Sequence, residues 1–337
     1  MPIVKLFSIV AGVSLALFGL SGCGSDGDSS RLSVQLSWIK NSEFAGEYFA
    51  DTNRYYAEAG FGSVNLISGP TDTTASVLTG EAFVGLADAI STAQSVSEGA
   101  TLKIIGATYQ KNPFSILSIK NRSNIRSPRE MIGKRIGVQA GNNEALFDAF
   151  LRANDISASR VTKVSVGYDP TPLVSGEVDG FLAFVTNESI TVQNLGYEVT
   201  NMLFADNGLP FVAEAFVVTQ DSINTERAAL KGFLKATIRG WKDALADPDE
   251  GARLAVEVYG ADLGLDINKE KQQSAAQNEL LIVSEETVTN GLFTISPALQ
   301  AQNIASLRTT GYDLTAEQLF DLSLLEEVYA ENPELRE

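Results

Sequence analysis

Apolar and polar residues alternate at the start of the folded part of the chain. The apolar positions of residues 32–38 lie on one face of an extended segment that ends in Trp38, which predicts a half-buried strand. Apolar residues then recur at helical spacing from Phe44 to Ala59, and Gly60 follows as a stop signal. The pattern therefore predicts a strand followed by one continuous helix.

Short strands and helices keep alternating up to residue 109. Strands are expected at 64–68, 83–88 and 102–109, and helices near 73–79 and 90–98. From Phe114 the pattern restarts, with strands at 114–120, 135–140, 161–166 and 180–185 and a helix at 145–153. Strands that alternate with helices indicate mainly parallel α/β sheets.

A return to the first unit is expected near residue 213. Strand 215–219 leads into a long helix whose buried stripe runs from Leu230 to Leu245, and the remainder of the chain has helical patterning. We therefore expect an α/β protein with two lobes and a helical C-terminal tail, lobe 1 formed by residues 31–113 and 214–337 and lobe 2 by residues 114–213. Two crossings between lobes make a hinge, and the ligand is expected in the cleft between them.

The N-terminus has the features of an export signal. Lys5 precedes an apolar stretch from Leu6 to Leu20, and Cys23 follows at once in Leu-Ser-Gly-Cys. This run resembles a bacterial lipobox, and Cys23 is the one cysteine of the chain. We expect residues 1–22 to be a lipoprotein signal peptide, Cys23 to carry the lipid anchor, and residues 23–30 to be a flexible tether. The alternative is a plain signal peptide.

Composition narrows the possible chemistry. The net charge is −17, which disfavours nucleic acid as a partner because phosphate binding needs clustered Lys and Arg. The chain has no histidine, which excludes a histidine-based catalytic triad or zinc site, and a single cysteine forms no intrachain disulfide. We expect a monomeric binding protein with no catalytic residues, no metal and no cofactor.

Candidate binding residues cluster where predicted strands end. In an open α/β sheet, ligands sit at the carboxyl ends of the strands, where helix N-termini offer N–H donors. The first such stretch holds Trp38, Asn41, Glu43, Phe44 and Tyr48, although Phe44 and Tyr48 also fit the core stripe of the helix. Further candidates at strand ends are Asp88, which could instead be a helix cap, Tyr109, and Asn142 in the Gly-Asn-Asn-Glu turn.

Phe184, Asn187 and Glu188 form the most informative stretch. A buried strand ends there in an amide beside a carboxylate, and together these side chains could bind the polar edge of a nitrogen heterocycle. Alternatively, Asn187 caps a helix and Glu188 lies in its first turn.

Several runs resemble the NMT1/THI5-like group of solute-binding proteins from Leu32 to about Glu327. These are the opening Leu36–Tyr48, the Tyr-Tyr-Ala-Glu-Ala-Gly of 55–60, Ser68-Gly69-Pro70, Gly80–Asp88, Lys134–Val138, Gly176–Gly180 and Thr186-Asn187-Glu188. The resemblance implies a type II periplasmic-binding fold, partner permease and ATPase subunits of an ABC importer, and a small heterocyclic ligand of the riboflavin or thiamine-pyrimidine type. It also implies a location in the cell envelope, on the outer face of the cytoplasmic membrane or in the periplasm.

The alternatives are binding of a sulfonate, nitrate or another small anion on the same fold, a ligand sensor, and an enzyme like the pyrimidine synthase that resembles this group. That enzyme consumes a histidine of its own chain, so a chain without histidine disfavours it. Phe44 stands in the region where thiamine-pyrimidine binders often carry a histidine, and the Phe-Ala-Gly-Glu-Tyr run is more similar to the riboflavin-type members.

Overall fold

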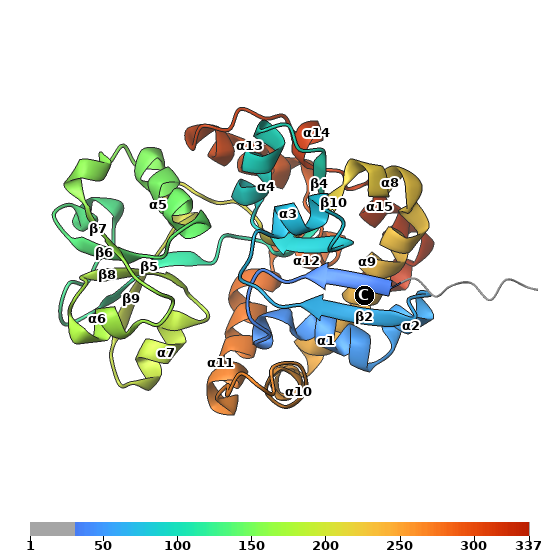
Figure 1. Cartoon of the computed structure of the whole chain (residues 1–337), viewed down its shortest axis with the longest axis horizontal. Coiled ribbons are helices and arrows are strands. Elements are labelled where there is room, and N and C mark those ends of the chain that lie inside the picture. The colour runs from blue at the N-terminus through green and yellow to red at the C-terminus, as the bar shows by residue number, and fades with distance from the viewer. Residues whose placement is uncertain (1–30, 337) are drawn as a thin grey trace, which may run out of the picture.

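The computed structural model describes residues 31–336, whose strands form two five-stranded sheets (Figure 1). The first sheet has the order β2-β1-β3-β10-β4, and its strands β1 to β3 run parallel while β10 lies antiparallel between β3 and β4. Its strands are β1 (Arg31–Gln35), β2 (Ser63–Ile67), β3 (Val84–Ala87), β4 (Leu102–Tyr109) and β10 (Ala213–Thr219).

The second sheet has the order β7-β6-β8-β5-β9. Here β6 is parallel to β7 and β8, and β5 is antiparallel to β8 and β9. The strands are β5 (Phe114–Ile119), β6 (Arg135–Val138), β7 (Thr162–Ser165), β8 (Gly180–Phe184) and β9 (Val199–Leu203). We refer to the parts built on the first and second sheets as the first and second lobes; they are the right and left halves of Figure 1.

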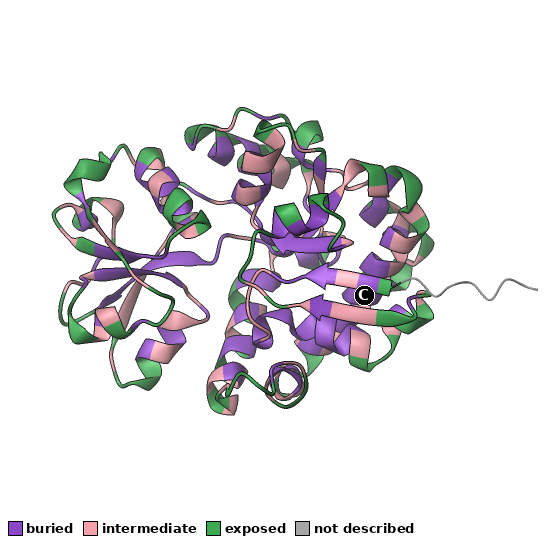
Figure 2. Ribbon diagram, in the orientation of Figure 1, coloured by how far each residue is buried: buried purple, intermediate pink, exposed green. Residues whose placement is uncertain are grey.

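The chain passes between the sheets twice, from β4 to β5 and from β9 to β10. Figure 2 shows that the central strands of both sheets are buried, as the apolar runs predicted, while the exposed residues lie on the outer helices and loops. Two α/β lobes with a helical C-terminal region confirm the predicted fold class.

Helices cover both sheets. Those of the first lobe up to β4 are α1 (Ala45–Thr52), α2 (Tyr55–Glu58), α3 (Thr73–Leu78) and α4 (Ala89–Ser97), and those of the second lobe are α5 (Asn142–Ala153), α6 (Thr171–Ser175) and α7 (Glu188–Asn194). After β10 come α8 (Gln220–Thr225), α9 (Arg227–Ala246), α10 (Pro248–Leu254), α11 (Ile267–Gln277), α12 (Glu285–Asn290), α13 (Pro297–Thr309), α14 (Ala316–Leu319) and α15 (Ser323–Glu331). In the part of the chain that the structure describes, no helix combines the length and apolarity needed to cross a bilayer.

The prediction of one continuous helix from Phe44 to Ala59 is wrong. A short 3₁₀ turn, η1 (Ser42–Phe44), leads into α1, and α2 follows only after a break at Arg54, whose φ of 64° is left-handed. A non-glycine residue in that conformation cannot continue a right-handed helix. The predicted signal peptide, the tether and the lipidation site Cys23 lie outside the described residues.

Helix α9 joins the tail to the first lobe. Its predicted stripe is buried from Leu230 to Trp241, while Leu245 is only half-buried. It crosses α1 at two glycines, where a Cβ on Gly240 would lie 2.1 Å from the Gly46 carbonyl oxygen and a Cβ on Gly46 would lie 2.2 Å from the Trp241 ring. The backbone of α9 therefore contacts that of α1 directly at Gly240, and the Trp241 ring packs against Gly46.

Glu47 is buried at this crossing, with its Oε1 accepting a hydrogen bond from Trp241 Nε1 at 3.3 Å. Its other oxygen has no hydrogen-bond partner among the described residues. Burial raises the pKa of Glu47 to about 8, so the side chain is protonated in the folded protein at neutral pH.

We expect Glu47→Gln to stabilise the protein at pH 8 and to change its stability much less at pH 5. The folded state keeps the Glu47 proton up to about pH 8, whereas the unfolded chain loses it near its ordinary pKa, so the free energy of unfolding falls as the pH rises between the two values. The difference between the folded and unfolded pKa values of Glu47 corresponds to a loss of stability on the order of 5 kcal/mol above pH 8. Glutamine is neutral throughout and can still accept from Trp241.

Melting temperatures of wild type and variant at pH 5 and pH 8 measure this difference. The exposed Glu81 supplies the control, because Glu81→Gln should leave the pH dependence of the melting temperature unchanged. A Glu47→Gln protein that loses as much stability as the wild type between pH 5 and pH 8 would contradict a protonated Glu47.

Candidate ligand-binding cleft

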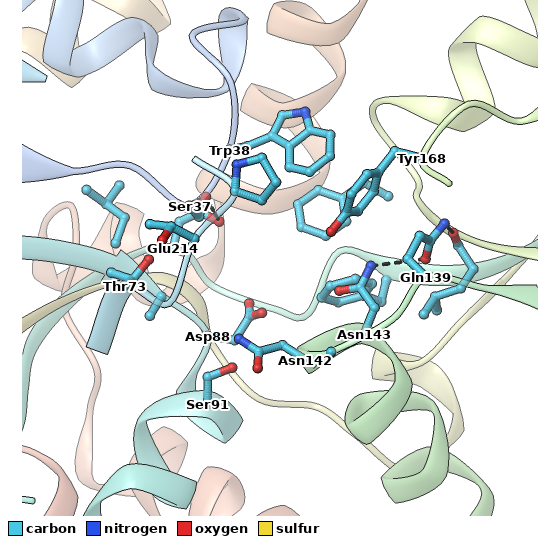
Figure 3. Close-up of a pocket in the computed structure, with 18 of the residues that line it drawn as sticks. Ser37, Trp38, Thr73, Asp88, Ser91, Gln139, Asn142, Asn143, Tyr168 and Glu214 are labelled. Carbon is cyan, nitrogen blue, oxygen red and sulfur yellow. Dashed lines mark hydrogen bonds between the residues drawn. The ribbon is translucent and has the colours of Figure 1, made fainter. Parts of the chain in front are cut away.

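A cavity of about 350 Å³ lies between the two lobes, within the size range of small-molecule sites. The first lobe contributes residues that follow β1 and β3 and precede or begin α3, together with the first residues of β10. The second lobe contributes the ends of β6 and β8, the first turns of α5 and α7, and the loop after β7. Figure 3 shows side chains from both lobes converging on this space.

Two aromatic rings, one from each lobe, meet at the edge of the cavity. Trp38 follows β1 in the first lobe and Tyr168 follows β7 in the second, and their ring centroids lie 4.3 Å apart in an edge-to-face arrangement (Figure 3). Both residues line the cavity. The pair thus supplies flat apolar surface at the mouth of a polar site, a geometry suited to a planar ligand.

Asn187 and Glu188 bring an amide and a carboxylate to the cavity from the start of α7. Glu188 Oε2 accepts from the Phe184 N–H at 2.8 Å, and Glu188 Oε1 accepts from Asn187 Nδ2 at 3.1 Å. As the capping alternative predicted, Asn187 occupies the N-cap position of α7 and Glu188 lies in its first turn, but the Asn187 side chain makes no hydrogen bond to the helix backbone.

A lysine of the C-terminal tail reaches this pair across the cleft. Lys269, on α11, donates from Nζ to Asn187 Oδ1 at 2.5 Å and also binds Glu270 Oε1 at 3.1 Å. Nearby on the same helix, Gln272 Oε1 accepts from Asn194 Nδ2 of α7 at 2.8 Å. Helix α11 therefore connects the first lobe to the polar edge of the second.

Three further carboxyl groups line the first-lobe side of the cavity. Glu43 lies in η1, Asp88 directly follows β3, and Glu214 is the second residue of β10. Burial is the main cause that raises the pKa of Asp88 to about 7 and the pKa values of Glu43 and Glu214 above their usual range. Asp88 occupies the N-cap position of α4, as the capping alternative predicted, and its side chain makes no cap hydrogen bond.

The structure brings most of the predicted binding residues to the cavity. The seven that line it are Trp38, Glu43, Asp88, Asn142, Phe184, Asn187 and Glu188. The other four, Asn41, Phe44, Tyr48 and Tyr109, are fully buried behind its wall.

Three of the four residues behind the wall hold η1, the turn that carries Glu43. Asn41 Oδ1 accepts from the Glu43 N–H at 3.1 Å, and Tyr48 donates to the Asn41 carbonyl at 2.9 Å. Tyr109 donates to Gln277 Oε1 at 2.8 Å, and Gln277 Nε2 in turn donates to the Ser42 carbonyl at 2.8 Å. Phe44 packs in the core of the first lobe.

Sequence reasoning missed several lining residues. The most important are Tyr168, in an exposed loop, and Glu214, in an otherwise apolar strand. Glu214 could have been found, because a single carboxylate within the run Phe-Val-Ala-Glu-Ala-Phe has no structural reason to be there. Ser37, Asp72, Thr73, Thr74, Ser91, Gln139 and Asn143 were also missed.

Residues 41–251 match the sequence profile of the family described as NMT1/THI5 like, which covers more than half of the chain. The chain belongs to the NMT1/THI5-like family. The matched residues include η1, both crossings between the sheets and most of the cavity lining. The resemblance inferred from sequence runs is thereby confirmed.

Two curated proteins are similar to this NMT1/THI5-like chain over most of its length. The riboflavin-binding protein RibY of Chloroflexus aurantiacus is 27% identical over 262 residues, which cover 74% of each chain. A putative thiamine biosynthesis protein of Haemophilus influenzae is 23% identical over 272 residues, covering 79% of this chain and 83% of that protein.

Solved structures confirm the periplasmic-binding-protein fold. The aliphatic sulphonate binding protein SsuA of Escherichia coli superposes with a TM-score of 0.64, covering 87% of this chain and 92% of SsuA at 14% sequence identity. An identity this low supports a common fold and carries no information about the ligand.

Proposed function

We propose that this chain is the solute-binding subunit of an ABC importer and captures a small planar nitrogen heterocycle in the cavity between its lobes. The observation that carries the proposal is the lining of the cavity. It combines the Trp38–Tyr168 aromatic pair with five acidic residues, and no Arg or Lys is among the described residues that line it. The acidic residues are Glu43, Asp72, Asp88, Glu188 and Glu214.

This lining disfavours a small oxyanion. Nitrate and sulfonates are recognised by charge-assisted hydrogen bonds from Arg, Lys or clustered N–H donors, and buried carboxylates would repel them. A heterocycle instead offers a ring face to Trp38 and Tyr168 and an edge of N–H and acceptor groups to Asn187 and Glu188. The names of the two curated relatives, which refer to riboflavin and to thiamine biosynthesis, support this class of ligand.

The proposed role also implies partner proteins and a cellular location. The two connections between the sheets serve as the hinge about which the lobes close on the ligand, and a permease and an ATPase receive it. Cys23 anchors the chain by lipid to the outer face of the cytoplasmic membrane or in the periplasm. The protein acts by binding alone, since the enzyme alternative depends on a histidine that the sequence does not contain.

Titration calorimetry with four ligands tests the proposal. We expect riboflavin or a 4-aminopyrimidine to bind with one-to-one stoichiometry, and we expect no binding heat from nitrate or taurine at the same concentrations. Tight binding of either anion, or no binding of either heterocycle, would contradict the heterocycle assignment and leave the fold and the family unaffected.

A further inference from the structure

The topology of the first sheet places three carboxyl groups at one edge of the cavity. β3 and β10 pair antiparallel with Ala87 opposite Ala215, so the next pair outward is Asp88 and Glu214. Glu43 lies beside Glu214, close enough for the two carboxyl groups to share a hydrogen bond. We call Glu43, Asp88 and Glu214 the carboxyl floor. Gathering three carboxyl groups in one buried place costs free energy, so a purely structural role would not select this arrangement.

The backbone supports the same conclusion. Glu214 has a φ of 45°, in the left-handed region that a non-glycine residue rarely adopts. Ser37 Oγ holds the Glu214 carboxyl at 2.8 and 2.9 Å from its two oxygens. Strained residues of this kind persist where the surrounding structure fixes them, and they concentrate at ligand sites.

The hydrogen bonds of the carboxyl floor are incomplete. Glu43 and Glu214 are each only 2% exposed, yet Glu43 Oε1 has no partner among the described residues, and neither has the buried Asp88 Oδ1. A buried carboxyl oxygen without a partner costs free energy, and more if it is charged. Both residues line the cavity, so a ligand bound there is the partner available to these acceptors.

We propose that the carboxyl floor binds a positively charged nitrogen of the ligand, so that the captured molecule is a cationic heterocycle. The inference rests on the proposed function and narrows it to ligands with a protonated or quaternary ring or amine nitrogen. Such a group would satisfy Asp88 Oδ1 and Glu43 Oε1 and would stabilise the ionised form of these buried carboxyl groups.

Two further observations favour an organic cation. In residues 31–336, no group of three or more acidic or cysteine side chains is arranged to hold a metal ion, so the floor does not form a metal site. The Trp38–Tyr168 pair lies above the same space in Figure 3, and indole rings attract cations through their π faces. A planar cation would therefore be bound from both sides.

A matched pair of ligands tests the charge directly. The N1-methyl-4-aminopyrimidinium ion is a permanent cation, whereas 4-pyrimidinone is a neutral ring of nearly equal size. We expect calorimetry at pH 7.5 to give a cation affinity about tenfold or more above that of the neutral ring, the range for a charge-assisted hydrogen bond. Asp88→Asn should remove most of this preference, and Asp88→Glu should keep it.

The control is Glu47→Gln, which neutralises a buried carboxyl that does not line the cavity and should leave both affinities unchanged. Circular dichroism checks that each variant is folded, and Glu214→Gln replaces Asp88→Asn if that variant is not. Riboflavin binding without a preference for the cation would overturn the charge assignment and leave the proposed function standing. Equal affinity for the two pyrimidines, or a preference that persists in Asp88→Asn, would also overturn it. If no heterocycle binds, the proposed function fails as well.

Discussion

Trp38→Ala is expected to weaken binding of the heterocyclic ligand about tenfold or more, with little change in the melting temperature of the free protein. The indole ring lies at the cavity mouth and contacts Tyr168 of the opposite lobe at a centroid distance of 4.3 Å. Its loss removes the stacking surface for the ligand and the aromatic contact between the lobes. An aromatic pair contributes about 1 kcal/mol beyond its buried area, and the lost area adds to this.

Titration calorimetry with the ligand that binds the wild type measures the effect. Trp38→Phe is the matched control, since a smaller ring keeps the face and should retain most of the affinity. Tyr168→Phe keeps the opposing ring and removes only the hydroxyl. Wild-type affinity in Trp38→Ala would show that the ligand does not use the aromatic pair, and would contradict the proposed site.

Gly240→Ala is expected to destabilise the first lobe by about 3 kcal/mol or more, at the upper end of the range for overpacked cores. The added Cβ would lie 2.1 Å from the Gly46 carbonyl oxygen and 2.8 Å from the Ala50 Cβ. The first obstacle is backbone, so no side-chain rotation can relieve it and α1 and α9 must move apart. The gain of about 1 kcal/mol from the higher helix propensity of alanine is too small to compensate.

Gly232→Ala on the same helix is the control. Its Cβ would lie 3.3 Å from the Ala59 Cβ, a contact that a small shift relieves, so the propensity gain should roughly offset the crowding. Urea denaturation of the two variants separates the effects. A Gly240→Ala protein as stable as Gly232→Ala would mean that the α1–α9 crossing is looser than the structure describes.

The strands were predictable because their apolar runs are short and bounded by turns. In the second lobe, each of the strands expected at 114–120, 135–140, 161–166 and 180–185 is present with ends shifted by a few residues, whereas β9 (Val199–Leu203) was not expected. The break between α1 and α2 was not predictable, because Arg54 is an ordinary helix residue by propensity and only the tertiary structure holds it at positive φ. The spacing of apolar residues predicts helices and strands, but it does not change where a single residue adopts a left-handed conformation.

The site was predictable where it coincides with the ends of parallel strands, as for Trp38, Asp88 and Glu188. It was not predictable at Tyr168, which lies in an exposed loop and reaches the cavity only because the two lobes face each other. Phe44 and Tyr48 fit the core stripe of the helix, and they are buried behind the cavity wall. Candidate binding residues can be identified from their position after a predicted strand. Which of them can contact a ligand depends on their burial, which the sequence does not give.

The position of β10 in the middle of the first sheet affects the order in which the two lobes can fold. β3 and β4 have no direct pairing in this sheet, because β10 lies between them and is synthesised more than a hundred residues after either strand. The second sheet, by contrast, is complete once residue 203 has been made. A nascent chain can therefore finish its second lobe while the first still exposes two unpaired strand edges, and contacts so distant in sequence form slowly. The first lobe is therefore expected to complete its folding after the second.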